Sequence, residues 1–138
     1  MGKTLLILLS CLPLTLMLDY LWLGKIMQRF YLSELGPYAR RRGDSIEPVY
    51  WAAGLVYLLI PLGVVLFALP RVNPAAPLLS SLGWGAIYGL VLYGVYDLTN
   101  MATLERWPLR MVLVDICWGI VLCATTTTFA WQVACRLH

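Results

Sequence analysis

Long apolar runs decide the fold, and residues 108–135, PLRMVLVDICWGIVLCATTTTFAWQVAC, show the pattern most fully. This run contains only two charged residues, Arg110 and Asp115. A helix crosses the hydrocarbon core of a bilayer with about 20 predominantly apolar residues. Three further runs have the same character, at residues 4–24, 48–69 and 78–100. The sequence therefore predicts an all-α integral membrane bundle of four transmembrane helices with up-down-up-down topology.

The composition agrees with a membrane protein. The chain of 138 residues is 61% hydrophobic and 12% charged, whereas soluble proteins contain about 25% charged residues. Four spans and their connections use nearly the whole length, so we expect one transmembrane domain over residues 1–138. The only histidine is His138, and the four cysteines show no C-x-x-C spacing. We therefore expect no metal site and no cofactor.

Basic residues are distributed unevenly between the two sides of this topology. Three lie on the side of the termini, namely Lys3, Arg71 and Arg136. Seven lie on the other side, namely Lys25, Arg29, Arg40, Arg41, Arg42, Arg106 and Arg110. The positive-inside rule places the side richer in basic residues in the cytoplasm. The net charge of +3 thus indicates membrane topology, and no nucleic-acid partner is expected.

Three aspartates lie in or at the end of apolar runs, and the topology brings them all to the basic side. Asp19 lies near the end of the first run, Asp97 ends the third, and Asp115 lies just inside the fourth. A carboxylate at the centre of a bilayer costs roughly 2.5–3.5 kcal/mol, so it is rarely found there without a partner or a function. These aspartates are the candidate catalytic residues. The candidate ligand-binding residues at the same depth are Trp22, Glu47, Tyr93, Asn100, Arg106, Arg110 and Trp118.

Two of the aspartates are followed by tryptophan at the same spacing. Asp19 and Trp22 lie three residues apart on one helix face, and Asp115 and Trp118 repeat this spacing. A third face is predicted to carry Tyr93, Asp97 and Asn100.

Arg110 is expected in the first turn of the fourth helix, where the helix dipole disfavours a cation. A nearby carboxylate would compensate, with Asp97 as the preferred partner and Asp115 as the second choice. Alternatively, Arg106 and Arg110 hold an anionic headgroup, because guanidinium binds phosphate in a bidentate way.

The chain resembles domain-of-unknown-function family 2177, a family of bacterial membrane proteins. The resemblance covers essentially the full length. It is carried by LDYLWLG (18–24), YDLTNMATL (96–104), WP (107–108) and VDICWG (114–119). It implies a four-helix fold in the bacterial cytoplasmic (inner) membrane and no particular reaction. Together with the positive-inside rule, it places the N- and C-termini in the periplasm.

These residues favour a protein that binds a lipid or isoprenoid-like small molecule near the cytoplasmic leaflet. Membrane lipids and such a hydrophobic ligand are the expected partners. Acid–base chemistry of the hydrolase or isomerase type would use Asp97 and Asp115 as acid and base. Asp19 or Glu47 would then be a third carboxylate, and Arg110 would orient them.

Two other functions remain open from the sequence. One is a small oligomeric transporter coupled to protons. The other is a non-catalytic accessory or structural subunit, with a homo-oligomer formed through the Gly85/Gly89 face. Polar contacts also lock membrane helices together without any further role, so the sequence does not decide whether the protein is an enzyme.

Overall fold

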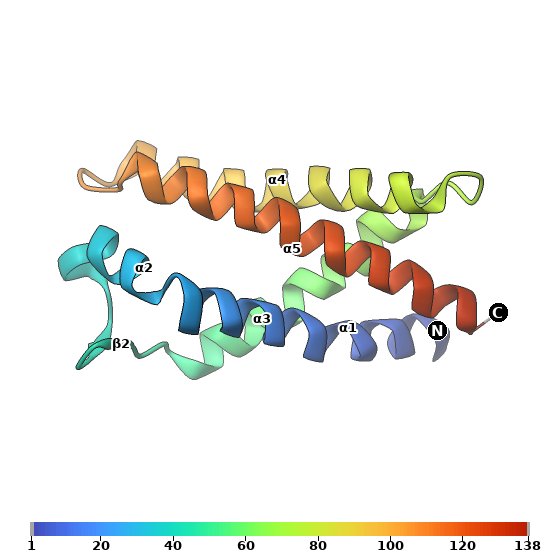
Figure 1. Cartoon of the computed structure of the whole chain (residues 1–138), viewed down its shortest axis with the longest axis horizontal. Coiled ribbons are helices and arrows are strands. Elements are labelled where there is room, and N and C mark those ends of the chain that lie inside the picture. Colours follow the sequence, from blue (N-terminus) through green and yellow to red (C-terminus); the bar gives the residue numbers. More distant parts are fainter. Residues whose placement is uncertain (1, 138) are drawn as a thin grey trace.

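A computed structural model describes residues 2–137, and helices make up most of them (Figure 1). Four helical segments are long and apolar enough to cross a membrane. They are Gly2–Ile26, Tyr50–Arg71, Pro77–Thr103 and Leu109–Arg136. The predicted all-α membrane bundle of four helices is confirmed.

The first span does not end as a regular α-helix. Helix α1 covers Gly2–Leu21 and then widens into a π-helical turn, η1 (Trp22–Ile26). A short helix, α2 (Gln28–Leu35), follows after Met27. It ends where Gly36 adopts a φ of +52°, a left-handed conformation that glycine tolerates best.

A small hairpin leads from α2 to the second span. After a 3-10 turn, η2 (Gly36–Tyr38), strands β1 (Arg41–Arg42) and β2 (Ser45–Ile46) pair antiparallel. Gly43 provides the positive φ of the turn between them. The Arg41 guanidinium donates to the carbonyl oxygen of Leu32, which ties the hairpin to the last turn of α2.

The second span changes its winding near its end. Helix α3 (Tyr50–Gly63) passes into a π-helical segment, η3 (Val64–Ala68), and a 3-10 turn, η4 (Leu69–Arg71). Pro61 lies just before this change, and it cannot donate the backbone hydrogen bond of a regular helix.

The last two spans form the most closely packed pair. Helices α4 (Pro77–Thr103) and α5 (Leu109–Arg136) approach each other at Gly85 and Gly89. A Cβ atom on Gly89 would lie 2.2 Å from the carbonyl oxygen of Gly119 in α5. The face formed by Gly85 and Gly89, which the sequence offered for contact with a second copy, is therefore covered by α5 of the same chain.

The two ends of the bundle differ in packing. In Figure 1, α2, the hairpin and the α4–α5 loop lie at one end, here called the α2 end. The start of α1 and the end of α5 lie at the other, the terminal end. The main apolar core is built around Ile7 and Cys11 of α1, Val64 of η3, and Leu122 and Ala130 of α5. The aspartates of the spans lie toward the α2 end, outside this core.

Candidate functional site: a cavity with a carboxylate wall

A cavity of about 700 Å³ lies among α1, α3, α4 and α5, toward the α2 end. Within residues 2–137, α4 packs against η3 and η4 but barely against α3 itself. The two spans therefore diverge toward the α2 end and leave the cavity open between them. Exposed apolar side chains of α3 line the cavity on this side, among them Val56 and Leu59. Tyr96 of α4 lines it from the other side.

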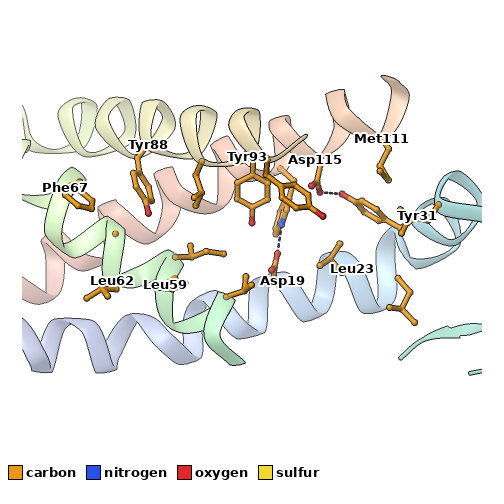
Figure 2. Close-up of a pocket in the computed structure, with 18 of the residues that line it drawn as sticks. Asp19, Leu23, Tyr31, Leu59, Leu62, Phe67, Tyr88, Tyr93, Met111 and Asp115 are labelled. Carbon is orange, nitrogen blue, oxygen red and sulfur yellow. Dashed lines mark hydrogen bonds between the residues drawn. The ribbon is translucent and has the colours of Figure 1, made fainter. Parts of the chain in front are cut away.

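The inner wall of the cavity holds two carboxyl groups, each fixed by a neutral donor (Figure 2). The indole Nε1 of Trp118 donates to Oδ1 of Asp19 at 2.6 Å. The hydroxyl of Tyr31 donates to Oδ1 of Asp115, also at 2.6 Å. The indole Nε1 of Trp22 donates in turn to the Tyr31 hydroxyl at 3.3 Å. The network joins α1, η1, α2 and α5.

The repeated Asp-x-x-Trp spacing now has a structural explanation. The rings of Trp22 and Trp118 stack with centroids 4.5 Å apart and planes 3° from parallel. From this stack each indole reaches across to the carboxyl group of the other helix, Trp118 directly to Asp19 and Trp22 through Tyr31 to Asp115. Neither tryptophan donates a hydrogen bond to the aspartate three residues before it.

Tyr31 is the residue of this network that the sequence analysis missed. It is 5% exposed although it lies in α2, outside the four spans. Burial, together with the adjacent Asp115 carboxylate, raises the pKa of the Tyr31 phenol. Tyr31 therefore serves as a neutral donor at physiological pH. The only sequence signal is an aromatic residue in an otherwise amphipathic segment, which is weak.

Asp97 lies behind the cavity wall. It is fully buried, and the indole Nε1 of Trp107 donates to its Oδ1 at 3.3 Å. Its other oxygen, Oδ2, has no hydrogen-bond partner among the described residues. The Asp115 carboxyl group lies close enough to interact with it. Two acidic side chains therefore lie close together here, Asp115 at the cavity surface and Asp97 behind it.

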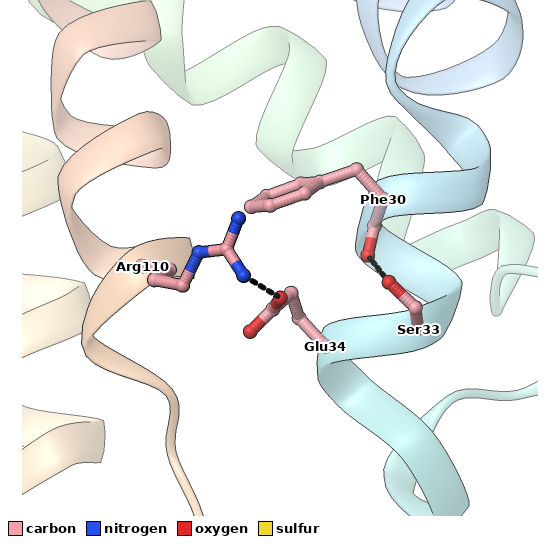
Figure 3. A network of polar contacts seen from close by, with 4 residues as sticks. All are labelled: Phe30, Ser33, Glu34 and Arg110. Carbon is pink, nitrogen blue, oxygen red and sulfur yellow. Dashed lines mark hydrogen bonds and ion pairs between the residues drawn. The ribbon is translucent and has the colours of Figure 1, made fainter.

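The arginines expected in the site lie elsewhere. Arg110 forms an ion pair of 3.9 Å with Glu34 of α2, and its side chain is 82% exposed (Figure 3). It pairs with neither Asp97 nor Asp115, because α2 brings a different carboxylate to the start of α5. Arg106 is exposed in the α4–α5 loop. Glu47 pairs with Arg42 of the hairpin at 3.6 Å and is not among the residues that line the cavity.

The predicted site residues thus divide into three groups. Four line the cavity: Asp19, Tyr93, Asp115 and Trp118. Two support its wall: Trp22, through the stack, and Asp97, through its contact with Asp115. Four are not among the lining residues: Glu47, Asn100, Arg106 and Arg110.

The chemistry of the cavity follows from its polar groups. Among the described lining residues, the only charged side chains are carboxylates, and the other polar atoms belong to tyrosine and tryptophan. No group of three or more His, Cys, Asp or Glu side chains within residues 2–137 is arranged to hold a metal ion. The site can accept hydrogen bonds and exchange protons, and it offers no cation to a ligand.

A family model described as "Predicted membrane protein (DUF2177)" matches residues 4–132. The matched region contains every residue that lines the cavity. No curated protein and no solved structure matches the chain.

Proposed function

We propose that this chain, which belongs to the DUF2177 family of predicted membrane proteins, binds a lipid or isoprenoid-like molecule that enters its cavity sideways from the bilayer. The observation that carries the proposal is the opening between α3 and α4. A volume of about 700 Å³ falls within the roughly 300–1,000 Å³ of typical small-molecule pockets. A ligand could keep its chain among the apolar rim residues while its head meets the polar wall.

We further propose that Asp115 is the residue best placed for acid–base chemistry on such a ligand. It lines the cavity and also contacts Asp97, which does not line it. Asp97 could therefore exchange a proton with Asp115 without touching the ligand. This is a positioning role for Asp97, whereas the sequence had suggested that both groups act directly.

The orientation of the protein is also part of this proposal. Lys25, Arg29 and the arginines of the hairpin lie at the α2 end. The positive-inside rule favours a cytoplasmic location for that end. The cavity would then open into the inner leaflet of the bacterial cytoplasmic membrane.

Blocking the opening tests the binding function. Val56 lines the cavity and Leu55, its neighbour in α3, does not, yet both are 49% exposed. We expect Val56→Trp to fill the opening and to lower the amount of retained lipid at least about tenfold, or roughly 1.4 kcal/mol of binding free energy. Leu55→Trp should retain as much lipid as the parent protein.

Native mass spectrometry of the protein in a mild neutral detergent measures the retained lipid. Equal retention by Val56→Trp and Leu55→Trp would show that the lipid is bound at the outer surface of the helices. Absence of any stoichiometric lipid on the parent protein, even after addition of bacterial lipid extract, would refute the proposed function.

A further inference from the structure

We infer that the cavity selects amphiphiles with a cationic headgroup, such as a long-chain amine or quaternary ammonium compound, and rejects phosphorylated lipids. The inference rests on the proposed function and specifies its ligand class. It departs from the sequence-based alternative, in which Arg106 and Arg110 bind an anionic headgroup.

Among the described residues, the charged side chains at the polar wall are all acidic. Asp19 and Asp115 line the cavity, and each uses Oδ1 in one hydrogen bond from a neutral donor. A carboxylate has about four lone-pair sites, so both groups can accept further bonds from a ligand. No lysine or arginine is found among the lining residues of the described chain. A cationic ligand would supply the missing counter-charge in a region of low dielectric constant.

The same charges oppose an anionic ligand. A phosphate in the cavity would lose its hydration next to two carboxyl groups and find no cation. Arg110 cannot compensate, because it is largely exposed and pairs with Glu34 outside the cavity. A desolvated charge without a partner is costly. Binding of a phosphate headgroup in the cavity is therefore unfavourable.

Aromatic side chains also line the cavity. Six of the twenty lining residues are tyrosine or tryptophan: Tyr31, Tyr88, Tyr93, Tyr96, Trp107 and Trp118. The faces of such rings attract ammonium groups, and aromatic cages are the usual recognition device for quaternary ammonium ligands. Tyr31, Tyr93 and Trp118 lie beside the carboxyl groups (Figure 2), so the acidic and the aromatic side chains there favour the same headgroup.

The remainder of the cavity is largely apolar. Away from the polar wall the lining is aliphatic, with Leu59, Leu62 and Leu66 along one edge of α3 and η3. Gly63 leaves room there for the hydroxyl of Tyr88, because a Cβ atom on Gly63 would lie 1.7 Å from it. Apart from that hydroxyl, the side chains named here are apolar and suit a hydrocarbon chain.

The test compares three probes that share one chain and differ only in the headgroup. They are dodecyltrimethylammonium, dodecanol and dodecyl phosphate, each added to the delipidated parent protein in a neutral maltoside detergent. Tryptophan fluorescence reports binding, since Trp107 and Trp118 line the cavity. We expect the ammonium probe to bind at least about tenfold more tightly than the alcohol, and the phosphate to bind more weakly than either.

Each outcome decides a separate question. Equal binding of the ammonium probe and the alcohol would mean that the carboxyl groups are neutralised by protons, and the inference would be overturned. Preference for the phosphate would overturn it as well. In both cases the cavity still binds a lipid, so the proposed function stands. Binding of none of the three probes would overturn the proposed function together with the inference.

Variants test whether the preference for the ammonium probe depends on the carboxyl groups of the cavity. The double variant Asp19→Asn/Asp115→Asn should lose the preference for the ammonium probe over the alcohol. Glu105→Gln is the matched control, because Glu105 is an exposed acid of the α4–α5 loop that does not line the cavity. It should retain the preference, and loss of the preference in Glu105→Gln would assign it to general surface charge. If the double variant fails to fold, the probe series on the parent protein still decides the inference.

Discussion

At the scale of single residues, the sequence pointed to some of the side chains that line the cavity but not to their hydrogen-bond partners. The expected topology placed Asp19 and Asp115 at one end of the bundle, and both line the cavity. It did not reveal Tyr31, because the partner of Tyr31 lies 84 positions away in the sequence. Arg110 was placed in the cluster by a helix-dipole argument, which considered only the carboxylates nearest along α4 and α5. The tertiary position of α2 gives it Glu34 instead.

The network around Tyr31 makes a first prediction at this scale. Tyr31→Phe removes the donor to Asp115 and the acceptor for Trp22. A buried polar group left without its partner costs about 1–3 kcal/mol, so we expect the free energy of unfolding to fall by that amount. Reversible unfolding in mixed micelles containing a denaturing detergent measures it. Tyr38→Phe, at a position that is 57% exposed, should change the free energy of unfolding by much less.

The pH dependence of the same variant gives an independent check. Burial raises the pKa of Tyr31 above its unfolded value of about 10, so the folded state holds this proton more tightly than the unfolded state. The Tyr31 hydroxyl therefore contributes fully to stability below about pH 10, and this contribution declines as the pH rises further. Tyr31→Phe should therefore lose less stability than the parent protein over this alkaline range. Parallel curves for the two proteins would contradict a buried, neutral phenol at this position.

At the scale of elements, hydropathy predicted the four spans well, because length and apolar character are local properties. The π-helical turns η1 and η3 were not predicted, since a wider turn has no clear sequence pattern. Such turns are frequent at functional sites, and η1 is the segment that carries Trp22 and joins α1 to α2. The small-xxx-small pair at Gly85 and Gly89 was found, but a spacing motif does not specify which helix it contacts.

The α4–α5 contact makes a second prediction. At Gly89, a new Cβ atom would lie 2.2 Å from a backbone oxygen of α5, so the two helices must separate. Overpacking of this kind typically costs about 1–3 kcal/mol. We expect Gly89→Ala to lower the free energy of unfolding by at least that amount. Gly83→Ala is the control in the same helix, because a Cβ atom there meets nothing within 4 Å. Equal effects of the two substitutions would show that helix propensity dominates over packing.

At the scale of the whole molecule, the arrangement of the spans decides whether there is a site at all. The four helices carry apolar residues on nearly all sides, so the sequence does not specify their tilts, which depend on packing against neighbours. The divergence of α3 from α4 therefore could not be predicted, and neither could the cavity that it leaves. The sequence predicted convergence of the aspartates because topology alone brings those segments to one end of a bundle. It did not predict that this end would be open at the side.

The orientation of the bundle is the remaining prediction, because it decides which leaflet the opening faces. In a background with the exposed cysteines Cys117 and Cys135 replaced by serine, single cysteines can be placed at the two ends. Ser45→Cys lies in the hairpin at the α2 end, and Ala75→Cys lies in the loop between η4 and α4.

The α2 side carries seven basic residues and the other side three, which favours a cytoplasmic α2 end. A membrane-impermeant maleimide should thus label Ala75→Cys in cells whose inner membrane is intact, and Ser45→Cys only after that membrane is opened. Labelling of Ser45→Cys in intact cells would place the cavity in the outer leaflet, and the ligand would have to be sought among the lipids found there.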